Sequence, residues 1–327
     1  MTGPDILTAS MVSRWTARDI PDQTGRTVVI TGANSGLGLR SAEALAAKGA
    51  RVLMACRNET KATTAVEGVR AVATAAEPEV VRLDLADLAS VRAAAEQIGE
   101  MTPAVDVLMN NAGVMAVPLG RTADGFEMQF GTNHLGHFAL TGLLLPTLLQ
   151  AQAPRVVTTS SNAHRMGRMR WDDLNWHHGR YRKWPAYGQS KLANLLFTLE
   201  LDGRAREAGG RLTAVAAHPG YAATHLQAVG PEQSGNKLVL IGMGALNRLV
   251  AQSDVMGALP QLYAATMPDV AGGEYFGPGG PFEVRGFPRR VGTTQAARDP
   301  EAARRLWDAS EALTGVLYRF SIADHEN

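Results

Sequence analysis

Two residues with complementary chemistry, Tyr187 and Lys191, lie four positions apart in the stretch Tyr-Gly-Gln-Ser-Lys. Leucines follow at positions 192, 195, 196 and 199, a spacing typical of an amphipathic helix. On a helix, side chains four residues apart lie on the same face, so the phenol and the ammonium group would share one environment. Because a nearby cation favours the phenolate, the pair predicts a proton donor and acceptor that works near neutral pH. The spacing alone is common in soluble helices, so its meaning depends on the preceding chain.

A glycine-rich turn near the amino terminus predicts a dinucleotide-binding site. Residues 26–31 are rich in β-branched side chains and predict a buried strand, and residues 41–46 follow a helical pattern. Between them stands the run Gly32-Ala33-Asn34-Ser35-Gly36-Leu37-Gly38. Glycines let the backbone turn tightly and approach a pyrophosphate, which then lies at the positive end of the following helix. The spacing differs from both the P-loop and the G-x-G-x-x-G motif, and a turn without any ligand is the alternative.

Four further motifs follow in order along the chain. They are Asn111-Ala112-Gly113 after an apolar run at 105–109, Asn133-His134-Leu135-Gly136-His137-Phe138, Ser160-Ser161 after a predicted strand at 155–159, and Pro219-Gly220 followed by Thr224. Together with Thr31, the glycine turn and the Tyr187–Lys191 pair, this order resembles the short-chain dehydrogenase/reductase family over about residues 25–225. Within that family, the chain is most similar to the retinol-dehydrogenase-like reductases.

The resemblance implies a catalytic set of four residues. Tyr187 would exchange a proton with the substrate oxygen, while Lys191 would lower the pKa of that phenol and bind the nicotinamide ribose. Ser161, rather than Ser160, would donate a hydrogen bond to the same oxygen as negative charge develops on it. Asn133 would hold a water molecule that connects Lys191 to solvent. Ser160 is expected to bond to the backbone instead.

The resemblance also implies which residues bind the cofactor. They are Gly32, Asn34, Ser35, Gly36, Leu37, Gly38, Arg57, Asp84, Leu85, Asn111, Ala112, Gly113, Tyr187, Lys191, Pro219, Gly220 and Thr224. NADP(H) is expected rather than NAD, because the uncharged Cys56 stands where a carboxylate would bind the 2′-hydroxyl of NAD. Arg57 follows at once, and a guanidinium is suited to bind the extra phosphate of NADP. The alternative is that Arg57 only ends a strand at the surface.

The alternation of strand and helix patterns over residues 26–220 predicts the fold class. We expect an α/β protein with a single Rossmann-type, doubly wound parallel sheet of about seven strands and helices on both faces. The whole chain, 1–327, is interpreted as one domain. It carries an amino-terminal extension at 1–24, a substrate-side segment at 225–250 and a Gly- and Pro-rich carboxyl-terminal extension at 271–327.

The two extensions carry weaker signals. Residues 1–24 are expected to pack on the sheet. The loop at 271–288 is expected near the cofactor cleft or in a subunit contact. Asp299, Pro300 and Glu301 predict the start of a last helix, which stops before Gly315.

Composition favours a soluble enzyme over a nucleic-acid-binding or membrane-spanning protein. The 327 residues are 45% hydrophobic, and the net charge of +1 comes without a basic run. No run of about 18 apolar residues is present, and residues 1–23 lack the apolar centre of a signal peptide. The single cysteine excludes an intrachain disulfide, so a cytoplasmic location is expected. The expected partner is a small alcohol or carbonyl compound. The resemblance also allows a homodimer through the helices that carry Asn133 and Tyr187.

The substrate is indicated only by composition. The segment between Ser161 and Tyr187 contains Met166, Met169, Trp171, Trp176, Tyr181 and Trp184, which predict either a large apolar pocket or anchors that hold the segment to the core. Residues 225–250 become strongly apolar and could form a cover over the substrate, a buried helix or a membrane-surface contact. A bulky, lipophilic alcohol, ketone or aldehyde is therefore expected.

Other functions fit the sequence less well. His134 and His137, and the adjacent His177 and His178, lack a third ligand at metal spacing, so core or solvated histidines are expected and no metal. A serine hydrolase is excluded because no G-x-S-x-G motif is present. A non-catalytic dinucleotide-binding sensor or scaffold is the competing function class. The complete set of Asn133, Ser161, Tyr187 and Lys191 argues for an enzyme.

Overall fold

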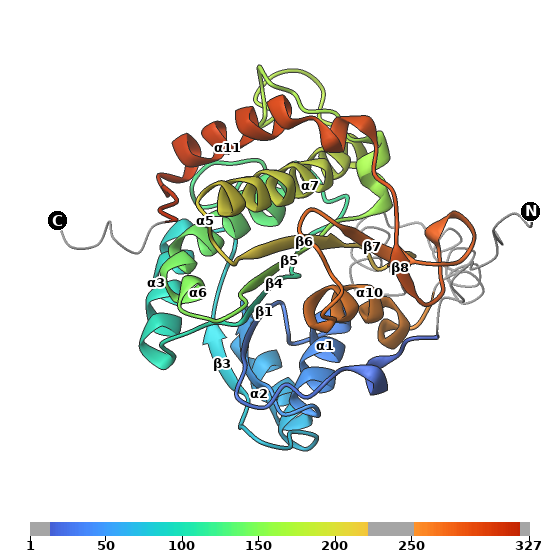
Figure 1. Ribbon diagram of the computed structural model, residues 1–327. Helices are drawn as coiled ribbons and strands as arrows, with labels where there is room; N and C mark the ends of the chain where they lie inside the picture. Colours follow the sequence, from blue (N-terminus) through green and yellow to red (C-terminus); the bar gives the residue numbers. More distant parts are fainter. Residues whose placement is uncertain (1–13, 222–251, 321–327) are drawn as a thin grey trace, which may run out of the picture.

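An eight-stranded sheet forms the centre of the molecule (Figure 1), and the computed structural model describes residues 14–221 and 252–320. The strand order is β3-β2-β1-β4-β5-β6-β7-β8. Strands β1 to β7 are parallel, and β8 runs antiparallel to β7. The strands are β1 (Thr27–Thr31), β2 (Arg51–Cys56), β3 (Glu79–Arg82), β4 (Val107–Asn110), β5 (Arg155–Thr159), β6 (Thr213–Ala217), β7 (Tyr275–Pro278) and β8 (Pro288–Arg290).

The predicted doubly wound α/β fold is therefore confirmed, with one correction to the number of strands. The sequence predicts about seven strands and misses β8. This edge strand has three residues, begins with proline and shows no alternation of apolar and polar residues. A segment of this length is too short to show the two-residue period of a strand.

Helices cover both faces of the sheet (Figure 1). They are α1 (Gly36–Ala46), α2 (Glu59–Arg70), α3 (Leu88–Met101), α4 (Met128–Phe130), α5 (Gly136–Leu143), α6 (Leu145–Leu149), α7 (Lys183–Glu207), α10 (Asp254–Thr266) and α11 (Pro300–Thr314). Along β1, Val28 and Ile30 pack in one apolar core with α1, α2 and α10. Val29 points to the other face and packs in a second core with α3, α5 and α7. This alternation explains why the three central residues of β1 are all apolar, because both faces of the strand are buried.

The strand order reverses beside β1, with β2 and β3 on one side and β4 to β7 on the other. Parallel strands present their carboxyl ends at one edge of the sheet. In open sheets of this kind, ligands bind at that edge, near the point of reversal. The motifs at 32–38, 111–113, 160–161 and 219–220 all follow carboxyl ends of strands, so the fold gathers them at this edge.

The amino-terminal end of the described chain packs on a helix. Trp15 is buried, its ring lies 5.2 Å from that of Tyr263 in α10, and its indole N–H donates to the sulfur of Met267. The sequence places residues 1–24 on the sheet. The described part of this extension lies instead against α10, which itself covers the sheet.

The last helix forms where the sequence predicts it. The Asp299 carboxylate accepts from the backbone N–H groups of Glu301 and Ala302, and Gly315 ends the helix with a left-handed φ of 66°. Among residues 14–221 and 252–320, no helix is long and apolar enough to cross a bilayer.

Candidate active site

The turn after β1 depends on its glycines. Gly32 and Gly36 have positive φ angles of 68° and 52°, a region that favours glycine. A Cβ atom on Gly38 would lie 2.5 Å from the carbonyl oxygen of Gly32 and 2.6 Å from Nδ2 of Asn111. Ser35 precedes α1, and its side chain makes no capping hydrogen bond. The first backbone N–H groups of α1 therefore stay available for an anion such as a pyrophosphate.

The hydroxyl of Thr31 joins the turn after β1 to the turn after β4. Its Oγ1 accepts from the backbone N–H groups of Asn111 and Ala112, each at 2.9 Å. The same oxygen lies 2.9 Å from Nε2 of His137. Because Nδ1 of His137 lies 3.0 Å from the carbonyl oxygen of Asn133, Nδ1 carries the proton and Nε2 accepts from Thr31. Burial lowers the pKa of His137 to about 4, which keeps this ring neutral.

Asn133 lies in a π-helical segment, Gly131–Leu135, between α4 and α5. Such segments are rare and often occur at functional sites. The buried carboxamide accepts from the backbone N–H of Val114 at 2.8 Å, and its Nδ2 lies 2.9 Å from the carbonyl oxygen of Val114 and 3.0 Å from the hydroxyl of Ser190. A Cβ atom on Gly113 would lie 2.9 Å from Oδ1 of Asn133 and 3.6 Å from Nζ of Lys191. Asn133 and Lys191 are therefore neighbours beside Gly113.

Helix α7 carries Tyr187 and Lys191 on a buried face. It begins at Lys183, about one turn before Tyr187. Tyr187 is 7% exposed and Lys191 is 4% exposed. The Lys191 ammonium lies 5.7 Å from the centre of the Tyr187 ring and donates to the carbonyl oxygen of Thr159 at 3.0 Å. The predicted sharing of one environment is thus present in the structure.

Burial dominates the protonation of this pair. It raises the pKa of Tyr187 to about 12, and a hydrogen bond with Ser161 acts in the opposite direction. Burial also lowers the pKa of Lys191 to about 8. At neutral pH the phenol therefore keeps its proton. Burial here outweighs any effect of Lys191 on the phenol, so the predicted lowering of the phenol's pKa stays a prediction for the loaded enzyme.

The two serines after β5 have different surroundings. Ser160 is buried, and its hydroxyl donates to the carbonyl oxygen of Lys191 at 2.8 Å, which is the backbone bond expected for it. Ser161 is only partly buried, accepts from the backbone N–H of Ala163 at 3.2 Å and bonds with Tyr187. The Ser161 hydroxyl is therefore the one that lies with the phenol.

The end of β2 is uncharged up to Arg57. Burial raises the pKa of the Cys56 thiol to about 11, so Cys56 is neutral. Arg57 is exposed, and within residues 14–221 and 252–320 its side chain has no hydrogen bond or ion pair. Glu59, two positions on, pairs with Arg82 at 3.1 Å instead. The Arg57 guanidinium is thus available for a ligand.

The remaining predicted cofactor residues lie along the same edge. After β3, the Asp84 carboxylate accepts from the backbone N–H of Ala86 at 3.0 Å. Leu85 lies against α5, where a Cβ atom on Gly136 would come within 2.4 Å of its carbonyl oxygen. Pro219 and Gly220 follow β6, and Gly220 has a positive φ of 67°. Thr224 and the segment 225–250 lie outside the described residues.

Part of the aromatic segment before Tyr187 serves as an anchor. Trp176 and Tyr181 pack edge to face at 5.5 Å, and the Tyr181 hydroxyl donates to the buried carboxylate of Glu127 at 2.8 Å. Trp171 lies under the guanidinium of Arg305 at 4.6 Å. These three aromatic residues attach the segment to the core and to α11.

Other residues of this segment remain at the surface near the site. Trp184 is 48% exposed, and its ring stands edge-on to that of Tyr187 at 6.1 Å. Met166 is 58% exposed in the 3₁₀ turn η3 (Asn162–Met166), which directly follows Ser161. The anchoring interpretation is therefore confirmed for Trp171, Trp176 and Tyr181, whereas the large apolar pocket stays a prediction.

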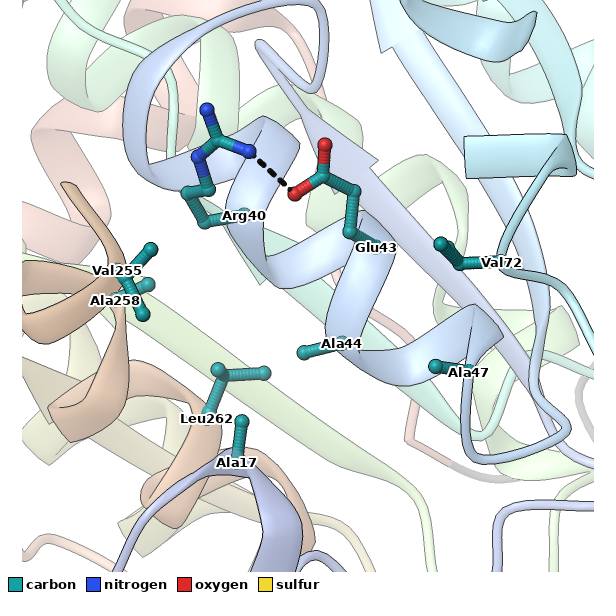
Figure 2. A pocket seen from close by; sticks show the side chains of 9 residues that line it. All are labelled: Ala17, Arg40, Glu43, Ala44, Ala47, Val72, Val255, Ala258 and Leu262. Carbon is teal, nitrogen blue, oxygen red and sulfur yellow. Dashed lines mark hydrogen bonds and ion pairs between the residues drawn. The ribbon is translucent and has the colours of Figure 1, made fainter. Parts of the chain in front are cut away.

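A separate apolar hollow of about 370 Å³ lies between α1, α10 and the 3₁₀ turn η1 (Ala17–Asp19) (Figure 2). It is lined by Ala17, Arg40, Glu43, Ala44, Ala47, Val72, Val255, Ala258 and Leu262. Its two charged residues, Arg40 and Glu43, pair with each other at 2.7 Å. None of the residues predicted for catalysis or cofactor binding lines this hollow, so the chemistry belongs to the carboxyl edge of the sheet.

His137 is a site residue whose role sequence reasoning missed. The sequence identifies it only as a core or solvated histidine. It is a core histidine, and it also connects Thr31 of the cofactor turn to Asn133. The signal was present, because His137 stands four residues after Asn133 and so lies on the same helix face. By contrast, His134 bonds to Ser310 of α11 at 2.9 Å and has a structural role.

A doubly wound sheet with a glycine turn at its reversal and a buried Tyr–Lys pair defines a nicotinamide-dependent oxidoreductase class. Residues 26–234 match the family model described as short chain dehydrogenase, and the chain belongs to this family. The resemblance inferred from the motifs is confirmed.

Named relatives give the same family. Human retinol dehydrogenase 13 is 40% identical over 295 residues, which cover 89% of this chain and 85% of that protein. The crystal structure of an uncharacterized protein from Mycobacterium paratuberculosis is 46% identical, covers 94% of this chain and all of that one, and superimposes with a TM-score of 0.76. A short chain dehydrogenase from Shigella flexneri, complexed with NADP, is 23% identical over 77% of this chain and 96% of its own, with a TM-score of 0.59. This last likeness concerns the fold alone.

Replacing Thr31 by valine is expected to weaken both stability and cofactor binding. Valine keeps the shape but removes the oxygen that accepts from Asn111 and Ala112. The Ala112 N–H would be left without its acceptor, which costs about 1–3 kcal/mol, whereas the Asn111 N–H keeps the carbonyl oxygen of Met109 at 2.9 Å. Thermal unfolding and NADPH titration would measure the two effects. Thr31→Ser keeps the oxygen and serves as the control; equal losses in both variants would contradict the role given to the hydroxyl.

Proposed function

We propose that this short-chain dehydrogenase/reductase uses NADP(H) to interconvert bulky, lipophilic alcohols with their aldehydes or ketones. The observation that carries the proposal is the convergence of Ser161, Tyr187 and Lys191 at the carboxyl edge of the sheet, with Asn133 beside Lys191. NADPH, when bound, supplies the hydride. The protein has to hold the carbonyl carbon beside it, polarise the carbonyl oxygen and provide a proton.

In the proposed reduction, Tyr187 is the acid. Its pKa of about 12 means that the phenol is protonated before the reaction. The Ser161 hydroxyl lies with the phenol and donates to the same substrate oxygen, which stabilises the charge that develops there. The buried Lys191 ammonium then favours the phenolate that Tyr187 becomes. Asn133, held by Val114 and Ser190, would position the water that returns a proton to this pair.

The choice of NADP(H) is supported by charge at the end of β2. Cys56 is neutral, so no carboxylate repels a 2′-phosphate there, and the exposed Arg57 has no partner within the described residues. Cys56 is a free, buried thiol, and we propose a cytoplasmic location on that basis.

The proposed substrate class is supported by exposed apolar side chains near the site and by the names of relatives. Leu119, Met166 and Trp184 are each about half exposed, at 51%, 58% and 48%, on segments that follow β4 and β5 or begin α7. The relative named retinol dehydrogenase 13 acts, by its name, on a long apolar alcohol. An aldehyde with an extended apolar body is therefore the proposed substrate for the reductive direction.

Tyr187→Phe is expected to abolish nearly all turnover while NADPH binding changes by no more than a few-fold. Phenylalanine keeps the packing but removes the proton, and general acid catalysis contributes typically ~10²–10⁴-fold. Single-turnover reduction of retinal and NADPH titration would separate the two effects. Tyr263→Phe, which removes a partly buried phenol that donates to Asp269, is the control. More than half of the wild-type rate in Tyr187→Phe would rule out this acid.

Arg57→Ala is expected to weaken NADPH binding about 10- to 150-fold and to leave NADH binding almost unchanged. A hydrogen bond to a charged group contributes about 1.5–3 kcal/mol, and only NADPH carries the extra phosphate. Titrating both cofactors against protein fluorescence tests this. Arg70→Ala removes another exposed arginine and is the control. Equal losses for NADPH and NADH would mean that Arg57 does not bind the phosphate.

Lengthening an aliphatic aldehyde by three carbons is expected to raise kcat/KM by about 50-fold until the pocket is full. The reason is that each buried methylene contributes roughly 0.8 kcal/mol. Rates with a series from butanal to dodecanal measure this directly. A flat response would contradict the lipophilic substrate class. The predicted cover at 225–250 lies outside the described residues and stays a prediction, which hydrogen exchange with and without ligands would test.

A further inference from the structure

The loop between β7 and β8 places a charged cluster against both sides of the site. Nη2 of Arg165 donates to the two carboxylate oxygens of Glu283 at 3.1 and 3.3 Å. Nε2 of His218 lies 3.1 Å from Oε2 of the same carboxylate, a close polar contact whose N–H is not aligned as a regular hydrogen bond. Arg165 belongs to η3, directly after Ser161, and His218 directly precedes Pro219. Arg165, His218 and Glu283 are here called the Glu283 cluster.

The protonation of His218 follows from its contacts. The backbone N–H of Gly220 donates to Nδ1 of His218 at 3.2 Å, so the neutral ring carries its proton on Nε2, which faces Glu283. Burial lowers the pKa of His218, and the neighbouring His218 imidazole lowers the pKa of Glu283. Both pKa shifts are those expected when a neutral imidazole lies beside an ionised carboxylate. Arg165 supplies the compensating positive charge from the solvent side, where its side chain is 47% exposed.

The fold leaves space for this arrangement. A Cβ atom on Gly277 in β7 would lie 2.0 Å from Nε2 of His218. Any larger residue at position 277 would therefore displace the imidazole from Glu283. The His218 side chain is fully buried, and its ring packs on that of Tyr275 at 5.1 Å, so it has no second position close by.

The backbone of the same loop also contacts both turns of the site. Nδ2 of Asn162, the residue after Ser161, lies 3.4 Å from the carbonyl oxygen of Phe282. The backbone N–H of Tyr221 donates to the carbonyl oxygen of Val284 at 2.8 Å. A Cβ atom on Gly220 would lie 2.4 Å from that oxygen, so the loop packs directly on the Pro-Gly turn.

Gln252 adds a second connection between the loop and the Pro-Gly turn. Its Nε2 donates to the carbonyl oxygen of Pro219 at 2.6 Å, and its Oε1 accepts from the backbone N–H of Gly286 at 3.1 Å. Its own backbone N–H donates to the carbonyl oxygen of Tyr221 at 2.9 Å. The loop therefore holds the chain on both sides of the segment 222–251, at Tyr221 and at Gln252.

The loop has an unusual backbone where the cluster forms. Phe282 and Glu283 have consecutive positive φ angles of 52° and 57°, although neither is glycine. Such conformations are uncommon and persist where surrounding contacts enforce them, often at functional sites. They turn the Glu283 carboxylate inward while Phe282 remains 92% exposed.

We propose that Glu283 is a positioning residue that fixes the turn after Ser161 relative to the Pro219–Gly220 turn. Through Arg165 it holds η3, and through His218 it holds the end of β6. It thereby sets the distance between the Ser161 hydroxyl and the wall of the nicotinamide site. The inference rests on the proposed roles of Ser161 and Gly220. If the two turns are no longer held in position, turnover should fall more than substrate binding does, because misplacing reacting groups by about 1 Å can reduce turnover ~10²-fold.

The test compares two carboxylates on either side of β7. Glu283 follows the strand at its site end, and Glu274 precedes it at the opposite end, where it pairs with Arg290. Glu283→Ala should lower kcat for retinal reduction about 10- to 100-fold, with KM changing only a few-fold. Glu283→Gln keeps one acceptor oxygen and should recover most of that loss. Glu274→Ala should keep kcat within about two-fold of the wild-type value, while its Tm should change about as much as that of Glu283→Ala.

A second variant and a second readout keep the outcome clear. Gly277→Ala retains all three side chains of the Glu283 cluster but pushes His218 from Glu283, and it should reproduce the loss in kcat if Glu283→Ala fails to fold. Hydrogen exchange should rise at residues 162–166 and 218–221 together in the Glu283 and Gly277 variants, and not in Glu274→Ala. Wild-type kcat and unchanged exchange in these variants would overturn the inference. If the wild type does not reduce retinal, the proposed function fails, and the exchange data alone then decide the inference.

Discussion

The hydroxyl of Thr31 is the contact on which the cofactor edge depends. It accepts from the turn after β4 and donates to His137, so a single oxygen fixes the separation of two turns and reaches the helix of Asn133. Gly38 allows α1 to approach closely enough for Asn111 to bond back to the carbonyl oxygen of Thr31 at 2.8 Å. Because β1 lies where the strand order reverses, a displacement of Thr31 would move both halves of the site.

Exclusion of water is the second constraint on the site. The same burial that raises the pKa of Tyr187 to about 12 lowers that of Lys191 to about 8, so two groups with similar pKa values in water are moved apart. Burial disfavours the charged form of each group, which keeps the phenol protonated and ready to donate to a substrate oxygen. The energy for this comes from the surrounding core of α7, which is buried on nearly all sides between Ala186 and Thr198.

The sequence was sufficient for the fold class, the family and the start and end of α11, because glycine turns, apolar strands and helix caps are local patterns. It was not sufficient for β8, which is too short to show a period, or for the role of His137, which depends on a tautomer fixed by two distant partners. The same limit applies to Glu283. Its partners are 118 and 65 positions away in sequence, and its backbone conformation has no residue signature.

The position of α11 affects how this enzyme can associate with itself. Trp307 of α11 packs against Phe138 of α5 at 5.1 Å and Phe197 of α7 at 6.0 Å, and Tyr318 packs on Phe138 at 4.9 Å. The outer faces of the two helices that would form a dimer by family resemblance are thus covered by the chain's own carboxyl-terminal helix. A pair formed through α5 and α7 would have to displace a fully buried tryptophan. We therefore expect any self-association to use a different surface, because α11 already packs on α7.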